Sequence, residues 1–132
     1  MQRIDLQNDL DARRALVEAR EVFVRIKKST PPLLPDLSDI RNASNNVIVN
    51  LDHLLKSTTP VSYMEIVAGM MCGAVLLGAA QAELQSSPQN TRNPRQKILR
   101  EFCVDFDKSG YTTTIAQQLE NAKDPIPKQR SF

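Results

Sequence analysis

The stretch that decides the fold reads IVAGMMCGAVLLGAA, residues 66–80, and it contains no charged or amide side chain. A helix needs about twenty residues to span a bilayer, so these fifteen indicate the core helix of a soluble protein. We expect this helix to lie innermost and to be buried on all sides. Gly69, Gly73 and Gly78 each cost a helix about 1 kcal/mol relative to alanine, so neighbouring helices must approach closely enough to compensate.

Helical patterns flank this stretch on both sides. Apolar residues recur three and four positions apart, and the prolines fall between the periodic runs. We expect further helices over about residues 8–28, from Asp36 or Ser38 as N-cap to about Ser57, from Asn93-Pro94 to about Asp107, and in a short segment carrying Ile115, Leu119 and Ala122. The predicted fold class is all-α, a bundle of four main helices plus a short C-terminal helix. One domain over residues 1–123 precedes a flexible tail over 124–132.

The ends of two helices have specific signals. The core helix begins either with Pro60 at its first position or, one turn later, with a capping box formed by Ser62 and Glu65. Gly110 follows Ser109 and is expected to end the preceding helix in the left-handed conformation. Elsewhere no convincing strand pattern is found, although Val47-Ile48-Val49 is a short β-like run.

Composition excludes several classes of function. Seventeen basic and 15 acidic residues give a net charge of +2, too small to attract nucleic acid or an anionic membrane over the whole surface. No signal peptide is found at the N-terminus, so we expect a cytoplasmic protein that does not contact a membrane. Cys72 and Cys103 have no histidine nearby and are expected to be buried free thiols. We therefore predict neither a metal site nor a cofactor.

The first helix has two apolar stripes. Ala12, Leu16, Ala19, Phe23 and Ile26 form the stripe that we expect to face the core. Leu6, Leu10, Val17 and Val24 lie on nearly the opposite side. Because a small domain rarely covers both sides of a peripheral helix, Leu10, Val17 and Val24 are predicted to mediate self-association, giving a homo-oligomer.

Four cations gather at the start of the fourth helix: Arg92, Arg95, Lys97 and Arg100. Cations are unfavourable at that end of a helix dipole, and residues that break a local rule are candidates for function. Beside free backbone N–H groups they could hold a phosphate or the carboxylates of a partner. A solvated, charged helix end is the alternative interpretation.

His53-Leu54-Leu55-Lys56-Ser57 resembles the H-x-L-K-G motif of histidine phosphotransfer domains, which are also small helical bundles. The resemblance implies that His53 accepts a phosphoryl group and that Lys56 stabilises its charge. The sequence departs from that family at Thr59-Pro60, which ends the helix where the family's helix continues. An ordinary surface histidine is the alternative.

Two further motifs are incomplete. Residues 105–110, DFDKSG, match the first half of an EF-hand loop, but Ala116 stands where the last calcium ligand should be. Residues 110–119 resemble the first helix of a helix-turn-helix domain, yet Pro125 and Pro127 follow where the recognition helix should lie. Neither motif favours calcium binding or DNA reading, and residues 105–110 are better interpreted as a helix end.

The combined prediction is a non-enzymatic, self-associating helical module that binds a protein partner. An adaptor, an inhibitor or an accessory protein, including one encoded by a phage or mobile element, would fit this description. The first alternative is nucleic-acid, nucleotide or phosphate binding through the cations at 92–100, which is not favoured. The second is phosphotransfer at His53.

Overall fold

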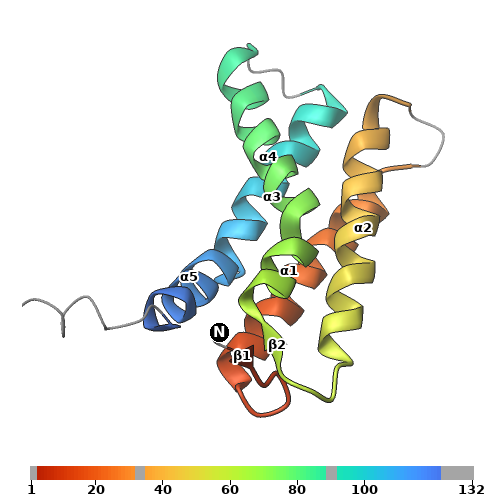
Figure 1. Ribbon diagram of the computed structural model, residues 1–132. Coiled ribbons are helices and arrows are strands. Elements are labelled where there is room, and N and C mark those ends of the chain that lie inside the picture. The colour runs from red at the N-terminus through yellow and green to blue at the C-terminus, as the bar shows by residue number, and fades with distance from the viewer. Residues whose placement is uncertain (1–2, 32–34, 89–91, 123–132) are drawn as a thin grey trace, which may run out of the picture.

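The computed structural model of the protein describes residues 3–31, 35–88 and 92–122, which form five α-helices and two very short strands (Figure 1). In chain order these are β1 (Arg3–Ile4), α1 (Leu10–Ser29), a 3₁₀ turn (Pro35–Leu37), α2 (Ser38–Leu55), β2 (Val61–Ser62), α3 (Tyr63–Ser86), α4 (Pro94–Lys108) and α5 (Tyr111–Ala122). The predicted all-α bundle of four main helices and a shorter last helix is confirmed. The predicted tail over 124–132 lies outside the described residues.

Local signals place most of the helix ends. Ser62 accepts a hydrogen bond from the backbone N–H of Glu65, and the Glu65 carboxylate accepts one from the backbone N–H of Ser62. Of the two predicted starts for this helix, the capping box is therefore the observed one. Asn93 is the N-cap of α4, with Pro94 at its first position, and Gly110 follows the helix with a φ of 74°.

The start of α2 differs from the prediction. Neither Asp36 nor Ser38 is the N-cap, because Leu37 occupies that position and has no side-chain capping bond. The 3₁₀ turn leads directly into the helix, and burial of Leu37 in the core fixes the entry of the chain instead. Tertiary packing thus replaces the local cap that the sequence suggested.

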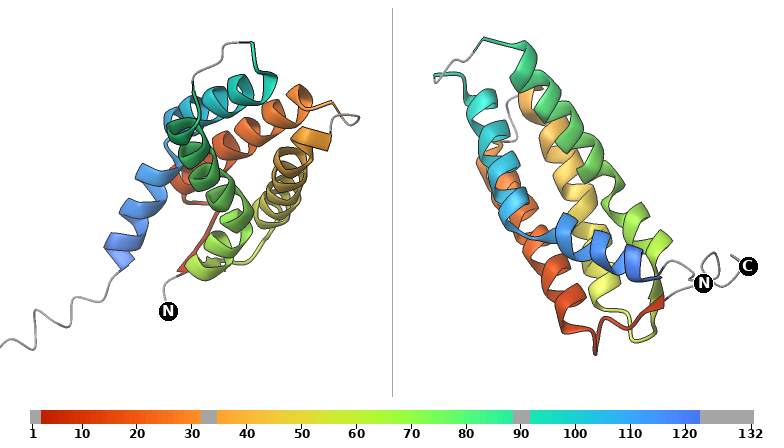
Figure 2. Two further views of the ribbon diagram at one scale, coloured as in Figure 1. Left: turned by 90° about the horizontal axis from the view of Figure 1, so that it is seen from above. Right: turned by 90° about the vertical axis from the view of Figure 1, so that its left-hand side faces the viewer.

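Helix α1 packs against α2, α4 and α5 (Figure 2). All five residues of its predicted core stripe are buried. Phe23 lies at the centre of an aromatic cluster, with its ring centroid 5.3 Å from that of Phe102 and 6.0 Å from that of Phe106. These large side chains contribute most to the core because apolar burial stabilises in proportion to area.

The prediction that residues 66–80 lie innermost is wrong. The helix α3 lies along one outer side of the bundle, between α2 and α4 (Figure 2). One side of this segment is buried, through Ile66, Gly69, Met70, Gly73, Leu76 and Ala80, and much of the rest is exposed. The absence of charge therefore does not reflect burial on all sides.

Helix α3 has 24 residues, more than the 15 of the uncharged stretch, so its length does not exclude a membrane span. Among the described residues it is the helix that is long and apolar enough to cross a membrane by length and composition. Only 39% of its most apolar window is buried inside the bundle. Its outward side is thus a large apolar surface.

The N-terminal segment pairs with the connection between α2 and α3. Ile4 in β1 lies opposite Val61 in β2, in antiparallel register, and both side chains are buried. Leu6, which the sequence assigned to the second stripe of the first helix, precedes α1 and is also buried. This pairing fastens the chain beside the first turn of α3.

Candidate interaction surface

The outward side of α3 is the largest group of exposed apolar residues on one helix of the described chain. We call it the α3 face; it consists of Met64, Val67, Ala68, Met71, Ala74, Val75, Gly78, Ala79 and Ala82, all exposed. The exposed fractions of Met64, Met71 and Val75 are 66%, 52% and 63%. These residues recur three and four apart, so they form one continuous stripe without a charged side chain.

A groove lies between this stripe and α2. Its volume is about 480 Å³, and its lining includes Met71, Cys72 and Val75 from α3. On the α2 side the lining includes Asn42 and Asn46. A second hollow of about 290 Å³ is formed by both helices nearer the start of α3. The α3 face is therefore not flat, because hollows along its α2 edge can receive side chains.

The edge of the groove on α2 is rich in asparagine. Asn42, Asn46 and Asn50 are spaced four residues apart, and the Asn50 amide donates a hydrogen bond of 2.9 Å to the Asn46 carbonyl oxygen. Amides both donate and accept hydrogen bonds but have no charge to desolvate. Val49, which is also exposed, extends the apolar area beyond them. Asp39 also lines the groove, and its carboxylate is paired with Arg95. A border of amides and one paired carboxylate suits contact with another protein.

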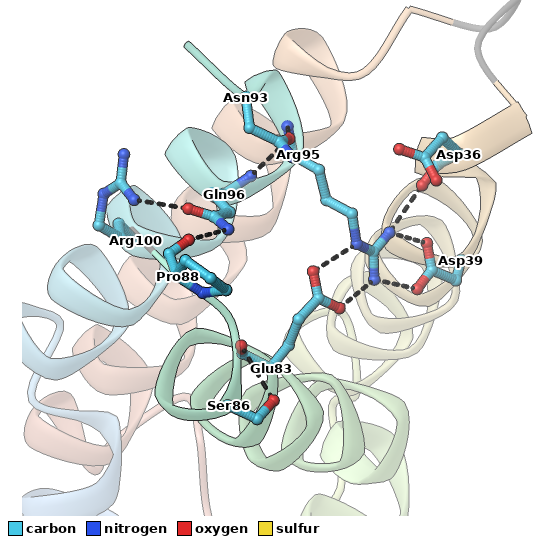
Figure 3. Close-up of polar contacts among 9 residues, drawn as sticks. All are labelled: Asp36, Asp39, Glu83, Ser86, Pro88, Asn93, Arg95, Gln96 and Arg100. Atoms are coloured by element: carbon cyan, nitrogen blue, oxygen red, sulfur yellow. Dashed lines mark hydrogen bonds and ion pairs between the residues drawn. The ribbon is translucent and has the colours of Figure 1, made fainter. Parts of the chain in front are cut away.

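The predicted cation cluster does not form an anion site around Arg95. The Arg95 guanidinium makes two bonds to the Glu83 carboxylate, at 2.8 and 3.0 Å, and two to the Asp39 carboxylate, both at 2.9 Å. A fifth bond, of 2.6 Å, goes to the carbonyl oxygen of Asp36 (Figure 3). All five N–H donors of this arginine are thus used within the protein. Arg95 joins α2, α3 and α4.

The backbone groups at the start of α4 are also used. The Asn93 side-chain oxygen accepts hydrogen bonds from the backbone N–H groups of Arg95 and Gln96, at 2.9 and 3.3 Å. Figure 3 shows Arg95 and Arg100 extending to opposite sides of α4. Lys97 is exposed. An anion site would need cations that converge on free backbone N–H groups. In the described part of this helix start, Arg95 and Arg100 diverge and the N–H groups of Arg95 and Gln96 are already bonded.

The bonds between Arg95 and Asp39 make the stability of the protein depend on pH. Hydrogen bonds from Arg95 are the largest cause of the lowered pKa of Asp39. The ionised form of Asp39 is therefore favoured in the folded state, and its contribution is complete above the unfolded pKa, about 3.9. We expect the free energy of unfolding to fall as the pH drops below about 4, through the folded pKa of Asp39. Urea denaturation across this range should show a shallower decline for Arg95→Met, and an unchanged slope would contradict the assignment.

The predicted self-association residues on α1 are less favourable than the α3 face. Leu10 is 68% exposed and Val17 38% exposed, while Val24 is half-buried. Charged residues such as Arg14 and Glu18 lie exposed between them. Single apolar residues scattered among charges are normal on a protein surface. Self-association through Leu10, Val17 and Val24 stays a prediction, and in the structure these residues form no continuous stripe.

The remaining candidates lie in separate places. His53 is exposed, as expected, and lies at the second hollow beside Glu65, while Lys56 is the residue that ends α2. Asp105 is 3.5 Å from Arg25 in an ion pair, consistent with a helix end rather than half of a calcium loop. Within the described ranges no group of three or more His, Cys, Asp or Glu residues is placed to hold a metal ion.

The two cysteines are free and only half-buried, where full burial was expected. Burial raises the pKa of the Cys103 thiol, which keeps it protonated and unreactive at neutral pH. Cys72 lies in the α2/α3 groove. Neither cysteine is bonded to the other in a disulfide.

Sequence reasoning missed the α3 face, although a signal for it was present. The largest side chains of the stretch fall on both sides of the helix, with Ile66 and Leu76 buried and Met71 and Val75 outward. The sequence also shows Asn42, Asn46 and Asn50 four residues apart on the preceding helix, which lies beside this stretch in the structure. Comparison with family models, characterised proteins and solved structures finds no match to this chain.

Proposed function

We propose that the protein is a non-enzymatic helical module that binds another protein through the α3 face. The observation that carries this proposal is the uninterrupted stripe from Met64 to Ala82, which is exposed and free of charge. Contiguous exposed apolar patches on soluble domains generally mark interaction sites, because leaving them in water is unfavourable. The adjacent groove supplies the shape that a specific partner needs.

Charge distribution supports a protein partner over a membrane or a nucleic acid. Helices that lie in a membrane interface have lysines and arginines along their polar border, whereas the border on α2 is formed by Asn42, Asn46 and Asn50. Nucleic acids require cations that neutralise phosphates. Arg95, the best placed of the predicted cations, is already bonded to two carboxylates.

The proposal is tested by a photo-crosslinking amino acid placed in the protein within the cells that make it. Benzophenone-alanine at Val75 or Met71 should form a covalent adduct with a protein, identified by mass spectrometry. Leu10 is the matched control, because it is apolar and as exposed as Val75 but lies on α1. An adduct only at Leu10 would move the interface to α1, and no adduct at any of the three positions would overturn the proposal.

A further inference from the structure

Resting on that proposed function, we infer that the partner on the α3 face is α3 of a second copy of this chain. The two helices run antiparallel about a twofold axis that passes close to Gly73, midway between Met64 and Ala82. A twofold interface uses the same patch on both copies, so the patch must be complementary to itself. Three observations on the α3 face support this arrangement.

The first observation is the distribution of side-chain size along the stripe. The half nearer the start of α3 has most of the bulky residues, Met64, Val67 and Met71, and one small residue, Ala68. The other half has mainly small residues, Ala74, Gly78, Ala79 and Ala82, and its one bulky residue, Val75, lies near the axis. Antiparallel pairing sets Met64 against Ala82 of the second copy and Val67 against Ala79 of the second copy. Parallel pairing would set bulky against bulky and small against small, leaving gaps that close packing does not tolerate.

The second observation concerns the three glycines of α3. A Cβ atom at Gly69 would lie 3.1 Å from Leu54, and one at Gly73 would lie 2.6 Å from Phe23, so both glycines permit close contacts within the protein. A Cβ atom at Gly78 would meet nothing within 4 Å. Nothing inside the described chain therefore offsets the poor helix propensity of Gly78. Close approach of another chain would offset it.

The third observation is the area available. The stripe from 64 to 82 is about 27 Å long and about 10 Å wide, from the rise and diameter of a helix. These dimensions give about 270 Å², and a strip of equal size along α2 would bring the area to roughly 500 Å² per copy, compared with about 800 Å² in a standard interface. This area is enough for a weak dimer, so we expect dissociation in the micromolar range.

Cysteine crosslinking distinguishes the possible arrangements. In a Cys72→Ala/Cys103→Ala background, Val75→Cys lies near the predicted axis and should crosslink to itself through a short bismaleimide. Met64→Cys alone should not, because antiparallel pairing places its two copies about 27 Å apart along the helices. A mixture of Met64→Cys and Ala82→Cys proteins should crosslink to each other. Self-crosslinking of Met64→Cys, without the mixed product, would show a parallel pair and overturn the inference.

Sedimentation at micromolar concentration measures the association itself. Val75→Glu should be a monomer, whereas Val17→Glu, the matched change on α1, should dimerise as the wild type does. Gly78→Leu should weaken the dimer by about tenfold or more, because it overpacks the contact, while Gly78→Ala should have a smaller effect. Circular dichroism establishes that each variant is folded.

The two proposals fail in different ways. If the wild type is a monomer and the photo-crosslinker at Val75 captures a different protein, the second copy is the wrong partner and the proposed function stands. If a monomeric wild type instead co-sediments with vesicles of neutral or anionic phospholipid, and Val75→Glu does not, the face contacts lipid and both proposals fail. A dimer that Val17→Glu dissociates and Val75→Glu leaves intact would also overturn the inference.

Discussion

Replacing Gly73 by leucine should leave the protein largely unfolded. A Cβ atom at this position would lie 2.6 Å from the Phe23 ring, 2.9 Å from the Met70 sulfur and 3.2 Å from Val47. Met70 can move, but Phe23 is held by a tilted ring contact with Phe102 and an edge-to-face contact with Phe106. Overpacking a core commonly costs about 1–3 kcal/mol and more where backbones must separate, which is a large part of a stability of about 5–15 kcal/mol.

Circular dichroism and urea denaturation measure this effect, and Gly73→Ala provides a graded version of it. The matched control is Gly78→Leu, the same substitution five residues further along the helix, where a Cβ atom meets nothing within 4 Å. That variant should fold with unchanged or slightly higher stability. The sequence predicted close approach of neighbouring helices at all three glycines of α3, and the open space at Gly78 makes that prediction wrong for this position within the described chain. Equal stability of Gly73→Leu and the wild type would contradict the packing of α1 against α3.

Replacing Arg95 by glutamate should lower the free energy of unfolding by about 3 kcal/mol. The change removes the bonds to Asp39 and Glu83 and sets a third carboxylate beside them. Loss of one partner from a buried ion pair costs about 3–5 kcal/mol, and the exposure of the Asp39 side chain reduces that figure. For a domain of this size the melting temperature should fall by about 10 °C.

Lys97→Glu is the matched control for this charge reversal, because Lys97 is exposed on the same helix. It should leave the melting temperature within about 2 °C of the wild type, as most surface changes do. The sequence placed Arg95 among four cations at a helix start and did not indicate its contacts with Asp39 and Glu83. An unchanged melting temperature in Arg95→Glu would show that the contacts of Arg95 contribute nothing to the fold.

Much of the fold was predictable because its signals are local. The Ser62/Glu65 capping box, Asn93 before Pro94, and Gly110 after α4 each act within a few residues and lie where the sequence placed them. The buried stripe of α1 follows from periodicity alone. Such features can be predicted without knowing the tertiary structure of the rest of the chain.

Other features depend on residues far apart in the sequence. Arg95 is 56 residues from Asp39, and no spacing rule indicates that the two side chains meet. Whether a mostly apolar helix is covered on one side or on all sides depends on how many helices surround it. When apolar residues are spread all around the helix axis, their periodicity does not show which side is covered. The prediction for α3 failed for this reason, and with it the location of the candidate surface.

Bonds at both ends of α3 hold the helix in place and keep its outward side in a fixed conformation. Near its start the helix is held by the capping box and by the pairing of β1 with β2, and near its end Glu83 is held by Arg95. The helix between these anchors is ordered before any partner arrives. Docking on it therefore needs no prior folding step, and little conformational entropy is lost on this side of the complex. Association with such a surface should be fast, and differences in affinity among variants should appear mainly in the rate of dissociation.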